Sequence, residues 1–257
     1  MKIASYNVNS IRSRLHIVLP WLENNKPDYF CMQETKVEDA KFPFDGFEEL
    51  GYFMSFRGNK QYNGVAIASR TKPQKVSFGL DDEPNDPDRL AVAHFNDLII
   101  INIYVPQGQE VDRPQFAYKL AWLSRLKKYL QKNFQTDQKV ILCGDFNVAP
   151  EKIDVHDPKR ILGHVSFNPE VWQAYEDMKS WGFTDIYRKH HPDEAGQYTF
   201  FDYRVRDSVG RNLGWRVDHI LATKPLAAES RSCAIDLASR LAEKPSDHVI
   251  IYAGWEG

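Results

Sequence analysis

Short apolar runs recur along the whole chain, and their regular spacing limits the possible fold more than any other feature. Runs of this length, bounded by polar or turn-forming residues, are typical of β-strands buried in a sheet. Asn96 and Asp97 lie between two of the runs and tolerate tight-turn dihedrals, which predicts an antiparallel hairpin and a sheet that is not purely parallel. The predicted strands are Ile3–Val8, Tyr29–Met32, Val65–Ser69, Leu90–Phe95, Leu98–Val105, Val140–Cys143, Val217–Ala222 and Val249–Ala253.

Helical signals separate several of these strands. After Asp112, Pro114 suits a first helical turn, and Phe116, Leu120, Leu123 and Leu130 follow near the 3.6-residue period. A second helix is expected from Asn168 through Trp181, opened by a capping Asn and closed by Gly182, and a third over Ser13–Asn24. Strands with a few interspersed helices predict an α/β sandwich, with helices outside and sheets stacked within.

Composition adds limits on organisation and location. The chain has 257 residues, 42% of them apolar, and no linker, low-complexity tract or repeat, so we expect a single domain over residues 1–257. Three cysteines cannot all pair, which suggests a reducing compartment. The sequence shows no signal-peptide pattern and no run of 18 apolar residues. The protein is therefore expected to be cytoplasmic and not bound to a membrane.

The overall charge gives no general attraction to a polyanion. The net charge is −2, from 33 basic and 35 acidic residues, so any binding of nucleic acid needs a local groove rather than a global field. Any one basic residue is more commonly an ordinary solvated side chain than a contact of nucleic acid. The residues that could line such a groove are Arg12, Lys36, Arg204, Arg206, Arg211 and Arg216.

The segment KVILCGDFNVAP, residues 139–150, shows how the apolar runs end. Its apolar part fits a buried strand, and it is followed directly by Gly144, Asp145, Phe146 and Asn147. Because a strand points residues i and i+2 the same way, Asp145 and Asn147 should project together while Phe146 faces the other side. An acid at the end of a buried strand suits a functional site.

Nearly every predicted strand is flanked by side chains that ligate metals or handle protons. Singly, each has a plain interpretation: Glu34 could start a helix, Asp145 could be a turn residue, and Asn7 could form an Asx turn. Together these interpretations fail, because carboxylates crowded at one rim repel one another and lose hydration unless a cation binds. The residues concerned are Asn7, Asn9, Gln33, Glu34, Tyr104, Gln107, Asp145, Asn147, Asp218, Asp247 and His248.

The types of ligand narrow the choice of ion. Cysteines with zinc spacing and the HEXXH motif are both missing from the sequence, and His190 and His191, before Pro192 in an expected loop, are interpreted as solvent residues. Carboxylate and amide oxygens favour Mg²⁺, with Mn²⁺ able to substitute. These ions act best on phosphate, so the predicted substrate is a phosphate ester.

At these residues the sequence resembles the exonuclease III type of apurinic/apyrimidinic (AP) endonuclease, within the endonuclease/exonuclease/phosphatase superfamily. Each short motif is weak alone, but their order along nearly the whole chain is specific. The resemblance implies a DNase I-like, four-layer αββα sandwich with two stacked mixed sheets flanked by helices. It is carried by SYNVNSIRSR, MQETKV, NGVAI, YVPQG, CGDFNVAP, YTFFDYR, LGWRVDH and EKPSDH.

The resemblance also implies roles for matching residues. Glu34 would be the principal Mg²⁺ ligand, with Asn7 and Asp247 beside the metal. His248, held by Asp218, would contact the phosphate, and Asn147 and Tyr104 would hydrogen-bond it. Asp145 would orient or deprotonate the attacking water. An ionised Tyr104 or a metal-bound hydroxide are alternatives to Asp145, because an aspartate of ordinary pKa is a weak base.

The implied function is Mg²⁺-dependent cleavage of duplex DNA on the 5′ side of abasic sites, with 3′ to 5′ exonuclease action and trimming of blocked 3′ ends. Phe200, Trp215 and Val217 match positions that in this family line a pocket for a base-free sugar, although ordinary core aromatics are commoner. Alternatives are a phosphodiesterase or phosphatase acting on a non-DNA phosphate ester, or an inactive DNA-binding homologue. A monomer is expected. Further predicted substrate contacts are Asn9, Gln107, Arg204, Arg211 and Arg216.

Overall fold

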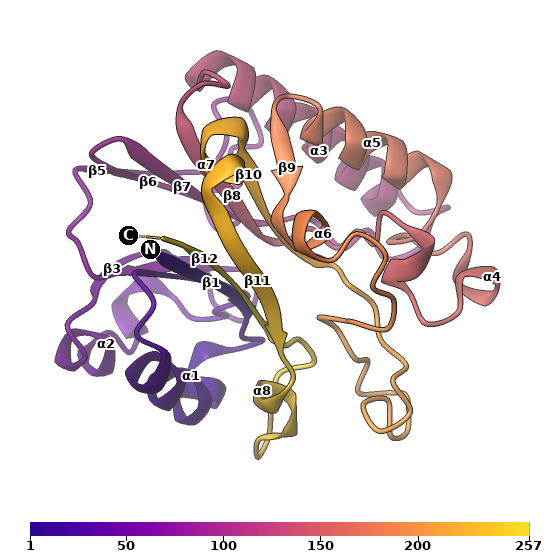
Figure 1. The fold of residues 1–257 in the computed structure, drawn as a ribbon, viewed down its shortest axis with the longest axis horizontal. Coiled ribbons are helices and arrows are strands. Elements are labelled where there is room, and N and C mark those ends of the chain that lie inside the picture. The colour runs from indigo at the N-terminus through magenta and orange to yellow at the C-terminus, as the bar shows by residue number, and fades with distance from the viewer. Residues whose placement is uncertain (257) are drawn as a thin grey trace.

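The computed structural model describes residues 1–256 and arranges them in four layers. Two six-stranded sheets stack face to face, with helices on both outer faces (Figure 1). The first sheet has the strand order β11-β12-β1-β2-β4-β3, and the second β5-β6-β7-β8-β10-β9. In each sheet one central pair is parallel, β1 with β2 and β7 with β8, while the neighbouring pairs are antiparallel. The expected αββα sandwich of mixed sheets is confirmed.

All eight predicted strands are present, with small differences at their ends. Phe95 pairs with Leu98 across the expected hairpin turn. The strands are β1 (Lys2–Asn7), β2 (Tyr29–Gln33), β4 (Val65–Ser69), β6 (Leu90–Phe95), β7 (Leu98–Tyr104), β8 (Lys139–Asp145), β10 (Asp218–Thr223) and β12 (Ile250–Trp255).

The four strands that the sequence did not predict are the edge strands of the two sheets. An edge strand is paired and covered on fewer sides, so it carries more exposed residues and no continuous apolar run. In β3, for example, only Ser55 of five residues is buried. The edge strands are β3 (Phe53–Arg57), β5 (Lys75–Phe78), β9 (Phe183–Asp185) and β11 (Ser230–Asp236).

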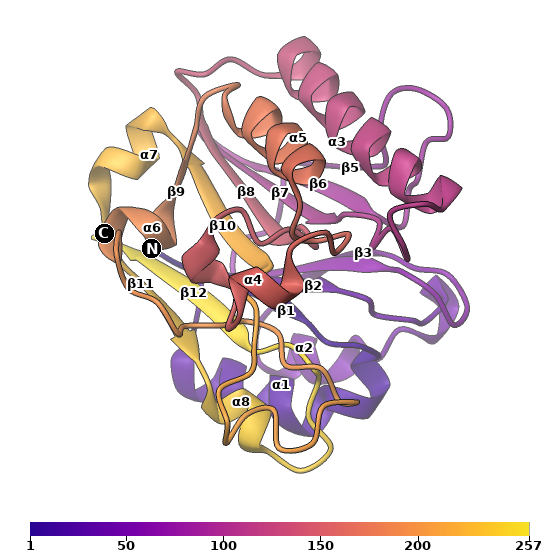
Figure 2. The same ribbon diagram turned by 90° about the vertical axis from the view of Figure 1, so that its right-hand side faces the viewer.

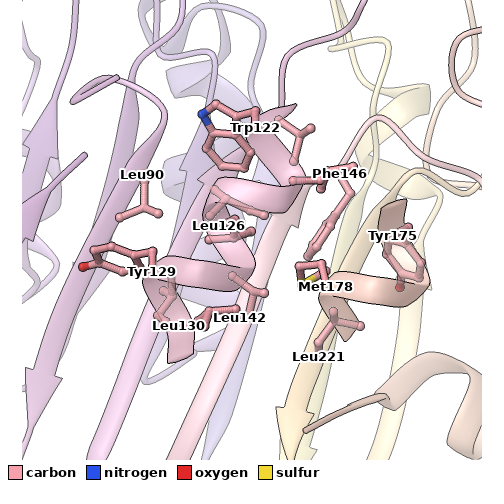
Figure 3. Close-up of a cluster of buried hydrophobic side chains, with 14 of the residues drawn as sticks. Leu90, Trp122, Leu126, Tyr129, Leu130, Leu142, Phe146, Tyr175, Met178 and Leu221 are labelled. Atoms are coloured by element: carbon pink, nitrogen blue, oxygen red, sulfur yellow. The ribbon is translucent and has the colours of Figure 1, made fainter. Parts of the chain in front are cut away.

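Helices cover the outer face of each sheet. Helices α1 (Ile11–Asn25) and α2 (Asp45–Glu49) pack on the first sheet, and α3 (Pro114–Asn133) and α5 (Pro169–Lys179) on the second. Figure 3 shows residues from α3 and α5 meeting Leu142 and Phe146. The three predicted helices are confirmed, and Asn168 caps α5 by accepting a hydrogen bond from the Val171 N–H at 3.1 Å. Shorter elements are η1 (Asp39–Lys41), η2 (Lys152–Asp154), α4 (Pro158–Ile161), α6 (Ile186–His190), α7 (Lys224–Glu229) and α8 (Ala238–Leu241).

The strands alternate between two cores. In β8, Val140 and Leu142 face the helices, while Ile141 and Cys143 face the other sheet. Asp145 continues the row that faces inward between the sheets, and Phe146 joins the helical side. The prediction that Asp145 and Phe146 point to opposite faces of the sheet is therefore confirmed.

The expectation for the two adjacent histidines is wrong. His190 ends α6 and His191 follows it, and both are half-buried rather than free in a solvent loop. The Nε2 atom of His190 lies 3.1 Å from Ser230 Oγ, and that of His191 lies 2.7 Å from the Cys233 carbonyl oxygen. These contacts hold α6 against β11.

Among residues 1–256, the helices are all too short or too polar to cross a membrane.

Candidate active site

The polar strand ends meet at one rim of the sandwich. Asn7 ends β1, Glu34 follows β2, Tyr104 ends β7 and Asp145 ends β8. These ends coincide because each parallel pair runs in one direction, with Asn7 opposite Gln33 and Tyr104 opposite Asp145. Antiparallel β10 starts at the same rim, where Asp218 pairs with Asp145. His248 reaches the rim from the segment before β12.

Asn7 joins the two sheets at this rim. Its Nδ2 atom donates to Glu34 Oε1 at 2.8 Å, in its own sheet, and to Asp145 Oδ2 at 2.9 Å, in the other. Its Oδ1 atom accepts a hydrogen bond from the Asn9 N–H at 3.0 Å. Asn7, which was expected beside the metal, therefore holds two carboxylates together through its amide nitrogen.

Asp145, Asp218 and His248 form a compact group, called here the rim cluster. One ligand atom from each lies within 4.8 Å of the others, and all three residues are buried. His248 Nδ1 lies 2.8 Å from Asp218 Oδ2, and His248 Nε2 lies 3.7 Å from Asp145 Oδ2. Among residues 1–256, the buried Asp218 Oδ1 atom has no hydrogen-bond partner. Two carboxylates, one of them with an unpartnered oxygen, and one imidazole fit a metal site.

The electrostatics of the rim cluster differ from those of ordinary side chains. Burial, helped by Asp218 and Glu34, raises the pKa of Asp145 to about 7 against the attraction of His248. Burial alone would lower the pKa of His248, but Asp218 and Asp145 outweigh it and raise that pKa to about 10. Near neutral pH the imidazole is therefore a cation, and Asp145 can both accept and release a proton.

Glu34 and Tyr104 lie beside the rim cluster with opposite behaviour. Burial opposes ionisation of Glu34, but Lys36 and Asn7 outweigh it and lower its pKa. Lys36 Nζ lies 2.7 Å from Glu34 Oε2. For Tyr104, burial and the negative charges of Glu34 and Asp145 hold the pKa well above its ordinary value. Tyr104 is therefore a neutral hydrogen-bond donor, which argues against its ionised form as the proton acceptor.

Asn147 and Asp247 also lie at this rim. The backbone N–H of Asn147 donates to Asp145 Oδ1 at 2.8 Å, and its Nδ2 to Asp145 Oδ2 at 3.2 Å. Asp247, half-buried, accepts at Oδ1 from Asn9 Nδ2 at 3.0 Å. Asn9 Oδ1 in turn accepts from Lys36 Nζ at 2.6 Å. The structure thus gathers the predicted catalytic residues together with Glu34, Asn7, Asp247 and Asn9.

The three apolar residues expected to contact substrate form one wall beside the rim cluster. Val217 is 3% exposed, and Phe200 and Trp215 are half-buried and pack with it. The Phe200 ring centroid lies 6.2 Å from that of Trp215 and 5.1 Å from that of His248. Gln107 is exposed beyond the end of β7.

One predicted contact of DNA is wrong, because Arg216 does not reach the surface. Its side chain is fully buried, and its guanidinium contacts Asp154 at 2.6 Å and Asp185 at 2.9 Å. The sequence did not show which way the Arg216 side chain points, because Arg216 lies between Trp215 and Val217 in one extended segment. Arg204 and Arg211 are exposed, on the long loop between α6 and β10 (Figure 2).

Sequence reasoning missed two polar residues near the site. Lys119 is fully buried in α3, and its Nζ contacts backbone carbonyls of site loops. His164 packs edge-on against Trp215 with ring centroids 4.4 Å apart. The periodicity of the α3 sequence contained a signal for Lys119, because its position falls on the apolar face with Phe116 and Leu123. A charged residue on such a face is unusual.

Comparisons with known proteins agree with this geometry. Residues 4–248 match the endonuclease/exonuclease/phosphatase family. The chain is 33% identical to exodeoxyribonuclease III of Haemophilus influenzae, across 98% of this chain and 99% of that protein. The structure of an AP endonuclease from Archaeoglobus fulgidus is 53% identical with a TM-score of 0.98, covering 100% of both chains.

A third relative was solved with nucleic acid. It is a 3′ phosphatase from Neisseria bound to a product DNA hairpin, 37% identical with a TM-score of 0.96, covering 100% of both chains. The resemblance stated from the sequence is thus confirmed, and so is the DNase I-like fold. The chain belongs to the endonuclease/exonuclease/phosphatase family, as a DNA repair nuclease of the exonuclease III and AP endonuclease type.

Proposed function

We propose that this protein is a Mg²⁺-dependent nuclease that cleaves the phosphodiester 5′ to abasic sites in duplex DNA, leaving a 3′-hydroxyl and a 5′-deoxyribose phosphate. The observation that carries the proposal is the rim cluster, in which one imidazolium offsets only part of the charge of two buried carboxylates, next to an aromatic wall. Perturbed pKa values of this kind concentrate at functional sites.

A divalent cation at this rim would be held by carboxylates, with Glu34 and Asp247 as the proposed ligands and Asn7 beside them. When bound, it would supply positive charge that offsets the phosphate oxygens. The unpartnered Asp218 Oδ1 and the close packing of carboxylates support binding of a cation in this region. Mg²⁺ is proposed because the available donors are mostly oxygens, and Mn²⁺ would substitute.

The protein's own groups would divide the remaining chemistry. Asp145 takes the proton of the attacking water, since its pKa of about 7 makes it a usable base near neutral pH. Asn147 holds Asp145 in place through the two hydrogen bonds described above. Tyr104, kept neutral, and His248, kept protonated, donate hydrogen bonds to the scissile phosphate and stabilise its developing charge.

Substrate choice would depend on the aromatic wall and on exposed cations. Phe200, Trp215 and Val217 would contact a sugar that has no base and leave little space for an intact nucleotide. Arg204 and Arg211 would contact the DNA backbone.

The 3′ phosphatase activity named for the Neisseria relative supports trimming of blocked 3′ ends as a further reaction, and we propose 3′ to 5′ exonuclease action beside it. We further propose that residues 1–257 form a single domain and act as a monomer. The proposed location is the cytoplasm, because its reducing conditions keep cysteines such as these three free.

The test uses duplex oligonucleotides that carry one abasic analogue, incubated with the protein in Mg²⁺ or in EDTA. We expect a nick on the 5′ side of the lesion in Mg²⁺, none in EDTA, and none in the matched duplex with an intact base. Binding without a nick would support an inactive homologue, and release of phosphate only from non-DNA esters would support a different substrate.

A further inference from the structure

Lys119 is a fully buried cation whose ammonium contacts main-chain carbonyls rather than a carboxylate. Its Nζ atom donates to the carbonyl oxygens of Asn147 at 2.7 Å, Val165 at 2.8 Å and Gln107 at 3.2 Å. A lysine ammonium has three N–H donors, so each donor has one acceptor. The side chain leaves the middle of the first half of α3 and ends among loops that are distant in sequence.

Each of the three carbonyls belongs to a different loop of the site. Gln107 lies in the loop after Tyr104, and Asn147 in the loop after Asp145. Val165 follows His164, whose ring packs on Trp215 of the aromatic wall. One ammonium therefore connects the loop of the proposed base, the loop of a proposed phosphate contact, and the segment behind the aromatic wall.

The local packing is arranged so that this side chain can pass. Gly108 has φ +97, and a Cβ there would lie 3.2 Å from Lys119 Cδ and 3.5 Å from Val165 Cβ. Any side chain would therefore be strained in its backbone and crowded against the lysine. Glycine at this position lets the loop after β7 close over the Lys119 stem.

Burying this charge is unfavourable for folding. Burial lowers the pKa of Lys119 to about 7, although the negative charge of Asp145 opposes the shift. An apolar side chain of similar length would fill the same space without that desolvation cost. The benefit is instead geometric, because main-chain carbonyls of irregular loops have few other ways to find a buried donor.

We propose that Lys119 is a positioning residue for the nuclease reaction, which fixes three loops of the active site relative to one another through their carbonyl groups. It touches neither the proposed water nor the phosphate, and it acts through Asn147, Gln107 and the segment next to Trp215. This proposal rests on the proposed function for its kinetic effect, but its structural effect is measurable without substrate.

The experiment compares three variants of the full chain. Lys119→Met keeps the length of the side chain and removes the ammonium, and Lys119→Arg keeps a cation with several donors. Leu126→Ala is the control, because Leu126 is also fully buried on α3, two helical turns after Lys119, but is apolar and donates no side-chain hydrogen bond to the site loops. Incision of the abasic duplex in Mg²⁺ gives kcat and KM, and thermal unfolding gives stability.

We expect Lys119→Met to lower kcat by about 10–100-fold, the range seen when supporting partners of a site are removed, with KM changed far less. Lys119→Arg should recover part of kcat. Leu126→Ala should lose stability and keep kcat. Wild-type kcat in Lys119→Met, or an equal loss of kcat in Leu126→Ala, would overturn the proposal, as would an arginine variant no better than methionine.

Hydrogen exchange separates this proposal from the proposed function. In Lys119→Met, without DNA, amides of residues 105–110, 145–150 and 162–168 should exchange faster together, whereas Leu126→Ala should leave them unchanged relative to its global stability. Unchanged exchange in those segments would refute the positioning role whatever the activity. If the wild-type protein fails to nick DNA while exchange responds as expected, the proposed function fails and the positioning role stands.

Discussion

Two buried groups of charged residues can be compared in this molecule. The rim cluster contains Asp145, Asp218 and His248, and a second group, called here the arginine cluster, contains Asp154, Asp185, Arg188 and Arg216. Both lie in the half of the chain after β7, and both bury two carboxylates. In the arginine cluster, Arg216 contacts both carboxylates and Arg188 contacts Asp154.

The two clusters affect their carboxylates in opposite ways. In the arginine cluster, burial opposes ionisation, but Arg216 outweighs it and lowers the pKa of Asp154 and of Asp185. In the rim cluster, burial wins and the pKa of Asp145 rises to about 7. The difference shows that the charges of the arginine cluster balance within the protein, whereas the rim cluster still needs positive charge from a bound ligand. Only the rim cluster is suited to bind a cation and a phosphate.

The largest expected effect is on catalysis at the rim cluster. Asp145→Asn removes the proposed base and keeps the shape of the side chain, so kcat for nicking at an abasic site should fall by about 10²–10⁴-fold. Affinity for the DNA should stay nearly unchanged, as measured by a gel-shift assay. Turnover at the wild-type rate would remove Asp145 from its role as proton acceptor.

The same change of Asp to Asn should have opposite effects on stability in the two clusters. Asp154→Asn leaves Arg216 and Arg188 short of a partner, so the free energy of unfolding should fall by about 3–5 kcal/mol. Asp145 has a folded pKa of about 7, above the ordinary value near 4 of the unfolded chain, so its ionisation disfavours the folded state above that lower pH.

Asp145→Asn removes this cost and should therefore stabilise the metal-free protein at pH 8, by about 1–3 kcal/mol because His248 loses some attraction at the same time. Chemical denaturation in EDTA measures both variants. A loss of stability in both would show that the rim cluster is balanced after all, and the contrast between the clusters would be gone.

The pH dependence of activity gives an intermediate effect. Asp145 must be ionised to accept a proton, so kcat/KM should fall about tenfold per pH unit as the pH drops below the Asp145 pKa of about 7. It should also fall above about pH 10, where His248 loses its proton. A bound cation favours the ionised carboxylate, so higher Mg²⁺ should move the acidic limb to lower pH. An acidic limb near pH 4 at low Mg²⁺ would contradict the raised pKa of Asp145.

The smallest effect is expected at exposed cations, which belong to neither cluster. Arg211→Gln should reduce the salt dependence of DNA binding by about one unit of slope. Arg204→Gln should do less, because Arg204 is already paired with Asp202 at 2.7 Å. Binding isotherms at several salt concentrations measure both. An unchanged slope for Arg211→Gln would place that residue outside the DNA contact.

The central part of the fold could be predicted from the sequence because buried strands have a local signal. The strands in the middle of each sheet are mostly apolar, and the three long helices have periodic apolar faces. The edge strands β3, β5, β9 and β11 have no such run, since their burial depends on one neighbour only. Sequence position also suggested which polar residues follow a strand, and the structure brings Glu34, Tyr104 and Asp145 to one rim.

Other features were decided by contacts between distant segments. The sequence alone placed Arg216 in a DNA groove, but Asp154 and Asp185, 62 and 31 residues away, bind it in the interior. Likewise, nothing local reveals that Lys119 meets carbonyls 12, 28 and 46 residues away. The amino-acid sequence determined the strands, the helices and the kinds of polar group at their ends, because these depend on neighbours along the chain. Only the tertiary structure decided which buried charges are neutralised and which remain available, because charge balance depends on distances in space.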